Sequence, residues 1–331
     1  MKKTALVTGG TAKDAPAMAS LLLNIKHTNN ILTDDIIIYH NGISNLDQTI
    51  MKKIMPVQFR LYNYPGKTEK FKDVVNNYFS TMIFCKYECF NLLNEYKAVI
   101  WTDFDVIINN DINELLTVPS SGFKLMPDIS HTVRTMFEKD INNTIENYKL
   151  DIPGICLSIF VLFDNMIYYN EYYKYCIEQT DRFAPYLNLP EQCIINLLLQ
   201  DYNIQYDSLD YKTYCVHPLH DIIKEHTKII HAYGQPKFWN GLYNAVWEKN
   251  YKTWIKMGGS EYFHRKFSYI LKIKIKKIIN IIQKINKFLL PPHIYRHVRN
   301  FYRIFLKYFY KDKFVKKIIV NILPPPPSNL R

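Results

Sequence analysis

The sequence predicts an α/β protein with a doubly wound, mostly parallel sheet, followed by a basic helical extension. Short β-branched apolar runs alternate with amphipathic helical segments over roughly the first 250 residues. The 331-residue chain has a net charge of +12, but 17 of its 42 Lys and Arg residues lie in 262–331, beside a single acid. The charge therefore belongs to the extension, and the overall basicity is no argument for nucleic-acid binding by the body of the chain.

The chain opens with a strand, a glycine turn and a helix, an order that is typical of nucleotide-binding sheets. The strand is expected at 4–8 and the helix at 14–27, with Gly9-Gly10-Thr11 between them. This turn matches neither the dinucleotide fingerprint nor the P-loop. Further strands are predicted at 35–40, 57–62, 98–102, 124–128, 153–164 and 228–231, and helices at 46–54, 78–96, 168–180 and 193–200.

Two carboxylates, Asp103 and Asp105, stand one residue apart where the buried strand at 98–102 should end. Ligands of an open α/β sheet bind at the carboxyl ends of its strands, and residues i and i+2 of extended chain point the same way. Two hard oxygen ligands at that place suit Mg²⁺ or Mn²⁺ carrying a diphosphate. The alternative is a pair of solvated turn acids, because a chain this rich in Asp contains about one D-x-D by chance.

Four motifs in order resemble those of family 8 retaining glycosyltransferases, over residues 4 to 254. The strand that ends at Thr8 resembles the family's uracil- and ribose-binding strand, and Lys86 resembles a lysine near the donor. Asp103-Phe104-Asp105 resembles the metal-binding motif. The fourth motif, His231-x-x-Gly234-x-x-Lys237-Phe238-Trp239, resembles H-x-x-G-x-x-K-P-W. The last motif is the most specific because several residue types must recur at fixed spacing. Phe238 replaces the usual Pro.

The resemblance implies a GT-A fold and a role for each matched residue. Mn²⁺, or Mg²⁺, would be bound by Asp103, Asp105 and His231, and the UDP-sugar donor by Thr8, Lys86, Asp103, Gly234 and Lys237. Taken singly, His231 would more often be a satisfied strand-end histidine than a ligand, and Lys237 would be a solvated surface charge.

A fifth segment, Glu191-Gln192-x-x-x-Asn196, resembles the family's D-Q-x-x-x-N. It implies catalytic roles for Glu191 on the sugar hydroxyls and for Gln192 near the anomeric carbon. The alternative for Glu191 is an acid that simply favours a helix N-terminus. Asp128 matches a family acid near the sugar, and Ile152-Pro153-Gly154 stands where the family has N-S-G.

The expected domains are a catalytic domain at 1–254, with a nucleotide-sugar half at 1–110 and an acceptor half at 111–254, and an extension at 255–331. The expected reaction moves galactose, glucose or N-acetylhexosamine, with retention, from a UDP-sugar to a hydroxyl of a bacterial surface glycolipid or polysaccharide precursor such as lipopolysaccharide. The alternatives are a sugar nucleotidyltransferase and a non-enzymatic membrane- or RNA-binding module.

The extension carries apolar residues at helical spacing over 267–289, and aromatic and basic residues over 294–323. Such faces favour an anionic membrane surface, with packing on the body or on another subunit as the alternative. An RNA-binding tail is a further alternative, because basic and aromatic residues together are also typical of it, but it ranks last and no nucleic-acid partner is expected. The six cysteines include no C-x-x-C pair, and no uncharged run is long enough to span a bilayer. We therefore expect a cytoplasmic protein, peripheral on the inner face of the cell membrane.

Overall fold

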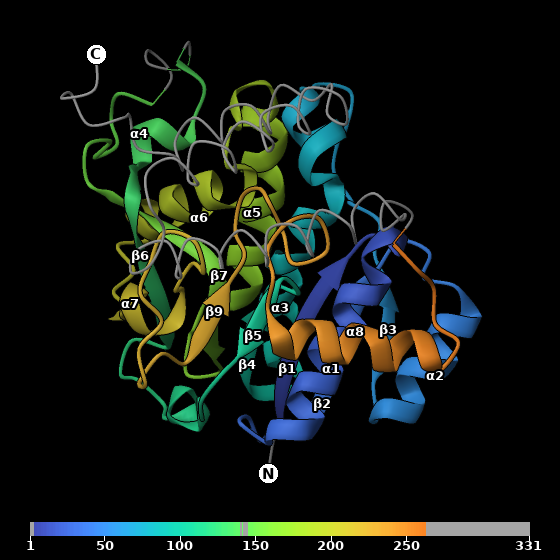
Figure 1. Cartoon of the computed structure of the whole chain (residues 1–331). Helices are drawn as coiled ribbons and strands as arrows, with labels where there is room; N and C mark the ends of the chain where they lie inside the picture. The colour runs from blue at the N-terminus through green and yellow to red at the C-terminus, as the bar shows by residue number, and fades with distance from the viewer. Residues whose placement is uncertain (1–2, 140, 142–144, 263–331) are drawn as a thin grey trace, which may run out of the picture. The chain divides into compact units, whose positions relative to one another are not determined.

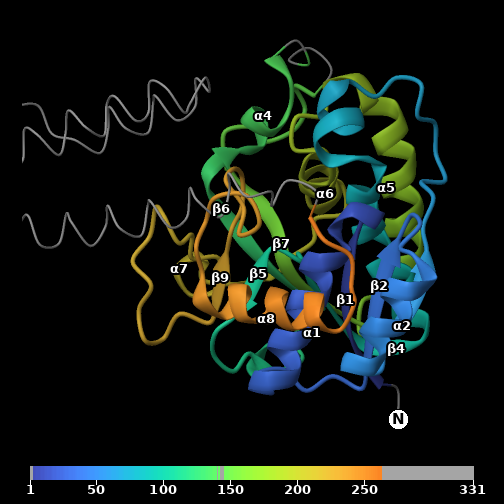
Figure 2. The ribbon, with the colours of Figure 1, turned by 45° about the vertical axis from the view of Figure 1, so that its right-hand side comes forward.

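The computed structural model describes residues 3–139, 141 and 145–262, and its centre is a seven-stranded sheet (Figures 1 and 2). The strands, in spatial order, are β3 (Gln58–Leu61), β2 (Asp35–His40), β1 (Lys3–Gly10), β4 (Tyr96–Thr102), β7 (Pro153–Phe163), β6 (Phe123–Thr132) and β8 (Asp207–Ser208). The first four run parallel to one another, as does the pair of β6 and β8. This confirms a mostly parallel α/β sheet.

The exception is β7, which runs antiparallel to both β4 and β6. The short helix α4 (Val133–Met136) follows β6 directly, and Thr132 at the end of β6 is paired with Pro153 at the start of β7. If β7 ran parallel to β6, the chain between them would have to cross from one end of the sheet to the other, and this connection does not do so. The sheet is therefore mixed, and β7 is the strand that departs from the parallel order of a mostly parallel sheet.

Helices cover both faces of the sheet (Figures 1 and 2). One face carries α1 (Ala15–Thr28), α2 (Asn45–Ile54) and α8 (Ala245–Lys256), and the other carries α3 (Glu88–Asn91), α5 (Tyr169–Phe183) and α6 (Pro190–Asp201). Strand side chains alternate between the two layers: Ile100 of β4 packs with the first and Trp101 with the second. The central strands are buried on both faces, which explains their nearly continuous apolar sequence.

The helix predicted at 78–96 is wrong as a single element. The structure has a π-helical turn η2 (Val74–Phe79), a 3₁₀ segment η3 (Thr81–Tyr87), α3, a 3₁₀ turn η4 (Leu92–Asn94), and then β4 from Tyr96. Ser80 separates the first two because its φ is +60°, outside the helical region, and its hydroxyl accepts a hydrogen bond from the Met82 N–H at 3.2 Å. The other predicted strands and helices lie where expected, with ends differing by a few residues; α8 was not predicted.

A separate two-stranded ribbon joins β5 (Val106–Ile108) to β9 (Ile229–His231), which are antiparallel. In its register Val106 stands opposite His231, and the Ala232 N–H donates to the Asp105 carbonyl at 3.0 Å. Nearby lies the short helix α7 (Tyr211–Tyr214). This ribbon brings the chain near residue 231 to the carboxyl end of β4, about 130 residues earlier in the sequence.

The predicted basic extension lies outside the described residues from 263 onward. Its expected contacts with a membrane, the body or another subunit therefore stay predictions. In the part of the chain that the structure covers, no helix combines the length and apolar character that a bilayer span requires.

Candidate active site

Asp103, Asp105 and His231 form one cluster of potential metal ligands. Each offers a ligand atom, and these atoms all lie within 4.8 Å of one another. The two aspartates lie in the turn between β4 and β5 rather than in extended strand. Backbone hydrogen bonds fix this turn, because the Asp103 N–H donates to the Ser158 carbonyl at 2.9 Å and the Asp105 carbonyl accepts from Ala232. The sequence prediction that these three residues meet is thus realised in their positions.

Asp105 is buried between a lysine and a histidine. His231 Nε2 lies 3.1 Å from Asp105 Oδ1, and Lys237 Nζ donates to Asp105 Oδ2. Burial alone would raise the pKa of Asp105, but Lys237 and His231 outweigh it and hold that pKa well below its ordinary value. Burial likewise works to lower the pKa of His231, yet Asp105 and Asp103 leave it raised. Asp105 is therefore an ionised carboxylate, the form that binds metals.

Asp103 belongs to a different network, centred on Lys86. The buried Lys86 ammonium lies 3.2 Å from Asp103 Oδ1 and 2.8 Å from Glu191 Oε1, and donates to the Leu157 carbonyl at 3.0 Å. Trp101 Nε1 also donates to Asp103 Oδ1, at 2.9 Å. Burial opposes the charge of Lys86, but the carboxylates of Asp103 and Glu191 raise its pKa above the ordinary value. The network ties the Asp103 turn to the N-terminus of α6.

Two predicted site residues hold buried polar atoms without a partner among the described residues. They are Gln192 Oε1, in the first turn of α6, and Thr8 Oγ1, on β1. A buried polar atom left unsatisfied costs about 1–3 kcal/mol, so such atoms are uncommon and call for an explanation. Both side chains therefore have hydrogen-bonding capacity that the described residues do not use.

The loop after β9 supplies Gly234, Lys237 and a ring stack. Gly234 has a φ of +62°, and nothing lies within 4 Å of the position where a Cβ would stand. The Trp239 ring stacks on Phe104, with centroids 6.0 Å apart, and on Tyr262, at 5.2 Å. Phe238, which replaces the expected Pro, is fully buried. The ring stack therefore attaches the loop to the Asp103-Phe104-Asp105 turn.

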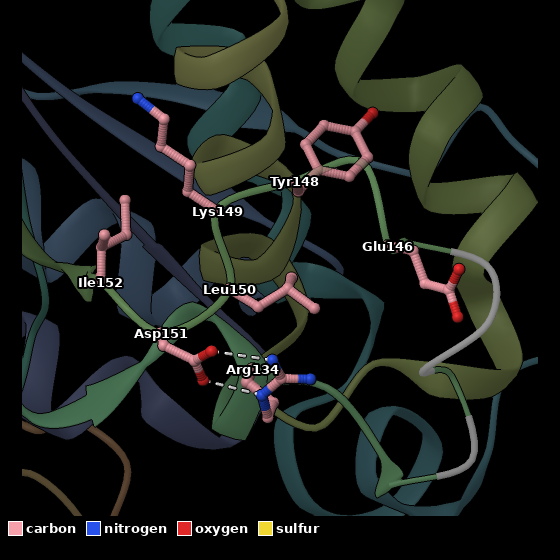
Figure 3. A pocket seen from close by; sticks show the side chains of 7 residues that line it. All are labelled: Arg134, Glu146, Tyr148, Lys149, Leu150, Asp151 and Ile152. Carbon is pink, nitrogen blue, oxygen red and sulfur yellow. Dashed lines mark hydrogen bonds and ion pairs between the residues drawn. The ribbon is translucent and has the colours of Figure 1, made fainter.

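Asp128 is not part of the cluster. Its carboxylate accepts hydrogen bonds from the Ser130 and His131 backbone N–H groups, at 2.7 and 3.0 Å. A hollow of about 670 Å³ lies beside α4, where Arg134 forms a forked ion pair with Asp151 (Figure 3). None of the predicted catalytic, donor-binding or metal-binding residues lines this hollow. We assign it no role in the site.

Sequence reasoning missed two residues that contact the cluster. Trp101 precedes Asp103 by two positions, and the extended chain expected there would have placed both side chains on one side. Cys215 Sγ lies 3.3 Å from His231 Nδ1, and it gave no sequence signal because it stands 16 residues away, beyond a loop.

Comparison with known proteins decides the family. The model of glycosyl transferase family 8 matches residues 15–242, more than half of the chain. The chain belongs to glycosyl transferase family 8. It is a retaining glycosyltransferase of a family that typically uses UDP-sugars and generally a divalent metal. Membership supports neither the nucleotidyltransferase nor the non-enzymatic alternative.

Solved structures show the same fold. The bifunctional glycosyltransferase WbbM in its apo form superimposes with a TM-score of 0.58 at 16% identity, covering 78% of this chain and 51% of that one. The galactosyltransferase LgtC, in complex with donor and acceptor sugar analogues, gives 0.54 at 9% identity, covering 76% and 94%. The chain thus spans about half the length of WbbM. No curated protein matches it by sequence. The expected GT-A-like fold is confirmed.

Proposed function

We propose that this family 8 enzyme transfers a hexose (galactose, glucose or N-acetylhexosamine) from a UDP-sugar to a hydroxyl of a bacterial surface glycolipid or polysaccharide precursor such as lipopolysaccharide. The observation that carries the donor part is the cluster of Asp103, Asp105 and His231, with Lys237 beside it. A diphosphate needs positive charge around it, and this is where the described chain gathers ligands for a cation next to a lysine.

The residues present fit a divalent cation. Two carboxylates and an imidazole are ligands that Mn²⁺ accepts, and Mg²⁺ accepts the oxygens. A bound ion would supply stabilisation for the charge that develops on the leaving diphosphate. Lys237 would add a second positive charge, and Gly234 would let the backbone approach the phosphates, because no side chain occupies the space above it.

Glu191 and Gln192 are proposed to act on the sugar. Glu191 is 2% exposed and its Oε1 accepts from Lys86, so its carboxylate is held in an ion pair and is poorly suited to attack carbon. Its resemblance to the acid of the family's D-Q-x-x-x-N motif supports a role on the sugar hydroxyls. The unpaired Gln192 Oε1 is suited to stabilise positive charge near the anomeric carbon. Retention would then follow from same-face attack, in which a diphosphate oxygen accepts the proton of the acceptor hydroxyl.

The experiment is a thermal-shift titration with UDP, with and without Mn²⁺, on the wild type and on Asp105→Asn. A ligand at 100 times its dissociation constant stabilises by about 2.7 kcal/mol, which a melting curve detects. We expect stabilisation by UDP that needs Mn²⁺ and is lost in Asp105→Asn. Asp207→Asn, which removes an exposed carboxylate on β8, is the matched control and should respond like the wild type.

Thermal shifts with UDP-galactose, UDP-glucose and UDP-N-acetylhexosamines then identify the donor. Assays of UDP release with glycolipid acceptors identify the acceptor. Stabilisation by another nucleoside diphosphate but not by UDP would overturn the donor assignment. An equal response to UDP in the wild type and in Asp105→Asn would overturn the role of the cluster.

A further inference from the structure

The two ring nitrogens of His231 have separate surroundings. Nε2 faces the cluster, 3.1 Å from Asp105 Oδ1 and 3.8 Å from Asp103 Oδ2. Nδ1 lies 3.3 Å from the Sγ of Cys215, its hydrogen-bond partner within the described part of the chain. A histidine that ligates through Nε2 carries its proton on Nδ1, and that proton needs an acceptor.

Backbone contacts fix Cys215 relative to His231. Cys215 is the C-cap that follows α7, is fully buried, and its N–H donates to the Tyr211 carbonyl at 2.9 Å. The next residue, Val216, donates to the Ile229 carbonyl at 3.1 Å and accepts from the His231 N–H at 3.0 Å. The thiol and the imidazole are thus held by neighbouring residues of one hydrogen-bonded segment.

Ser158 joins this thiol to the other side of the cluster. Its hydroxyl donates to Cys215 Sγ at 3.6 Å, and its carbonyl accepts from the Asp103 N–H at 2.9 Å. The Cys156 thiol donates in turn to the Ser158 hydroxyl at 3.4 Å, one step further from His231. Cys215 therefore belongs to a buried set of contacts that connects two of the three candidate ligands.

We propose that Cys215 is a positioning residue for the metal site. Its sulfur accepts the Nδ1 proton of His231 and so selects the tautomer whose Nε2 lone pair faces Asp103 and Asp105. Sulfur is a weak acceptor, but at a fully buried position water does not compete for the proton. The inference rests on the proposed function, because it needs the cluster to bind a cation.

The test measures the dissociation constant of Mn²⁺ by titration of the full chain, with free Mn²⁺ followed by electron paramagnetic resonance. Cys215→Ala should weaken Mn²⁺ binding about 10- to 100-fold, the range seen when an outer partner of a ligating histidine is removed. Cys215→Ser, which keeps an acceptor for Nδ1, should restore binding close to the wild-type value. Cys156→Ala, a thiol in the same contacts that does not touch His231, should bind as the wild type does.

Thermal melts establish that each variant is folded, and Cys215→Val, which fills the space without an acceptor, replaces Cys215→Ala if the latter does not fold. Wild-type affinity in Cys215→Ala or Cys215→Val would overturn the inference and leave the proposed function standing. An equal loss in Cys156→Ala, or no rescue by Cys215→Ser, would overturn it as well. A wild-type chain that binds no Mn²⁺ would overturn both, and the wild-type titration alone shows that case.

Discussion

Asp103 and Asp105 are one residue apart, yet the two sides of this turn are built differently. On the Asp105 side, the two partners His231 and Lys237 come from β9 and the loop that follows it. On the Asp103 side, the partner is Lys86, which is buried together with Glu191. The Asp103 side chain is 25% exposed, and that of Asp105 is 7% exposed. Asp105 is therefore held by a strand end and a loop, and Asp103 is held by a buried network of ion pairs.

This difference teaches how one short motif can serve two tasks. The loop side can adapt to a cation and a diphosphate, because Lys237 and Gly234 stand on a segment outside regular strands and helices. The network side is suited to hold the fold in place, because Lys86 and the carboxylates of Asp103 and Glu191 neutralise one another inside the protein. Changes on the two sides should therefore alter different measurements.

The largest effect is expected from Asp105→Asn. It removes the buried ligand that His231 and Lys237 surround, so loss of metal-dependent charge stabilisation worth about 4 kcal/mol should lower kcat/KM for the UDP-sugar about 1,000-fold. Transfer assays with saturating Mn²⁺ measure it, with Asp207→Asn as the control. A loss below tenfold would show that Asp105 is no essential ligand.

Glu191→Gln should mainly affect stability. It leaves the buried Lys86 ammonium with one carboxylate instead of two, and we expect a free energy of unfolding lower by about 3 kcal/mol. Denaturant unfolding measures it. Glu178→Gln, which breaks an exposed pair with Lys174, is the control and should cost less than about 0.5 kcal/mol. Similar losses in the two variants would contradict the interpretation of the Lys86 network.

Lys237→Ala should affect the affinity for the nucleotide but not the affinity for the metal. Without the ammonium, UDP affinity in the presence of Mn²⁺ should fall about 10- to 100-fold, since a hydrogen bond to a charged group is worth about 1.5–3 kcal/mol. Mn²⁺ affinity without UDP should not fall, because Lys237 competes for Asp105 as a cation. Calorimetric titrations check both values, with the exposed Lys212→Ala as the control. Equal weakening of both ligands would show that Lys237 acts only through Asp105.

The smallest expected effect is on the pH dependence of stability. Burial, with the nearby His220 and His231, lowers the pKa of His217 to about 4, whereas the unfolded chain has the ordinary value of 6.5. The unfolded state therefore binds a proton first as pH falls, and about 1–2 kcal/mol of stability should be lost between pH 6.5 and 4. His217→Gln should flatten this part of the stability profile, and His27→Gln, at an exposed position of α1, should not. An unchanged slope in His217→Gln would assign the acid sensitivity to other groups.

The parallel half of the sheet could be predicted from the sequence because its signals are local. Strands such as β1 and β2 are buried on both faces and read as apolar runs between turns. The grouping of the three candidate ligands could be predicted because their motifs resemble, in the same order, those of family 8. The break at Ser80 could not be predicted, since a serine with a positive φ does not alter the helical spacing of apolar residues.

The other features that the sequence did not predict depend on contacts between segments far apart in the chain. The antiparallel direction of β7 and the register of β5 with β9 depend on packing between distant segments, which periodicity does not encode. The 2.8 Å contact of Lys86 with Glu191 joins residues 105 positions apart, and nothing in either local sequence indicates it. The same holds for Cys215 beside His231.

The ring stack gives the protein an optical readout of its own. Trp239 is stacked between Phe104 and Tyr262, and the Trp101 indole N–H is bonded to Asp103, so two of the four tryptophans border the candidate site. The other two, Trp247 and Trp254, are buried against α1 and its neighbours. Intrinsic fluorescence should therefore respond when the loop after β9 or the Asp103 carboxylate changes partners, without any dye or label.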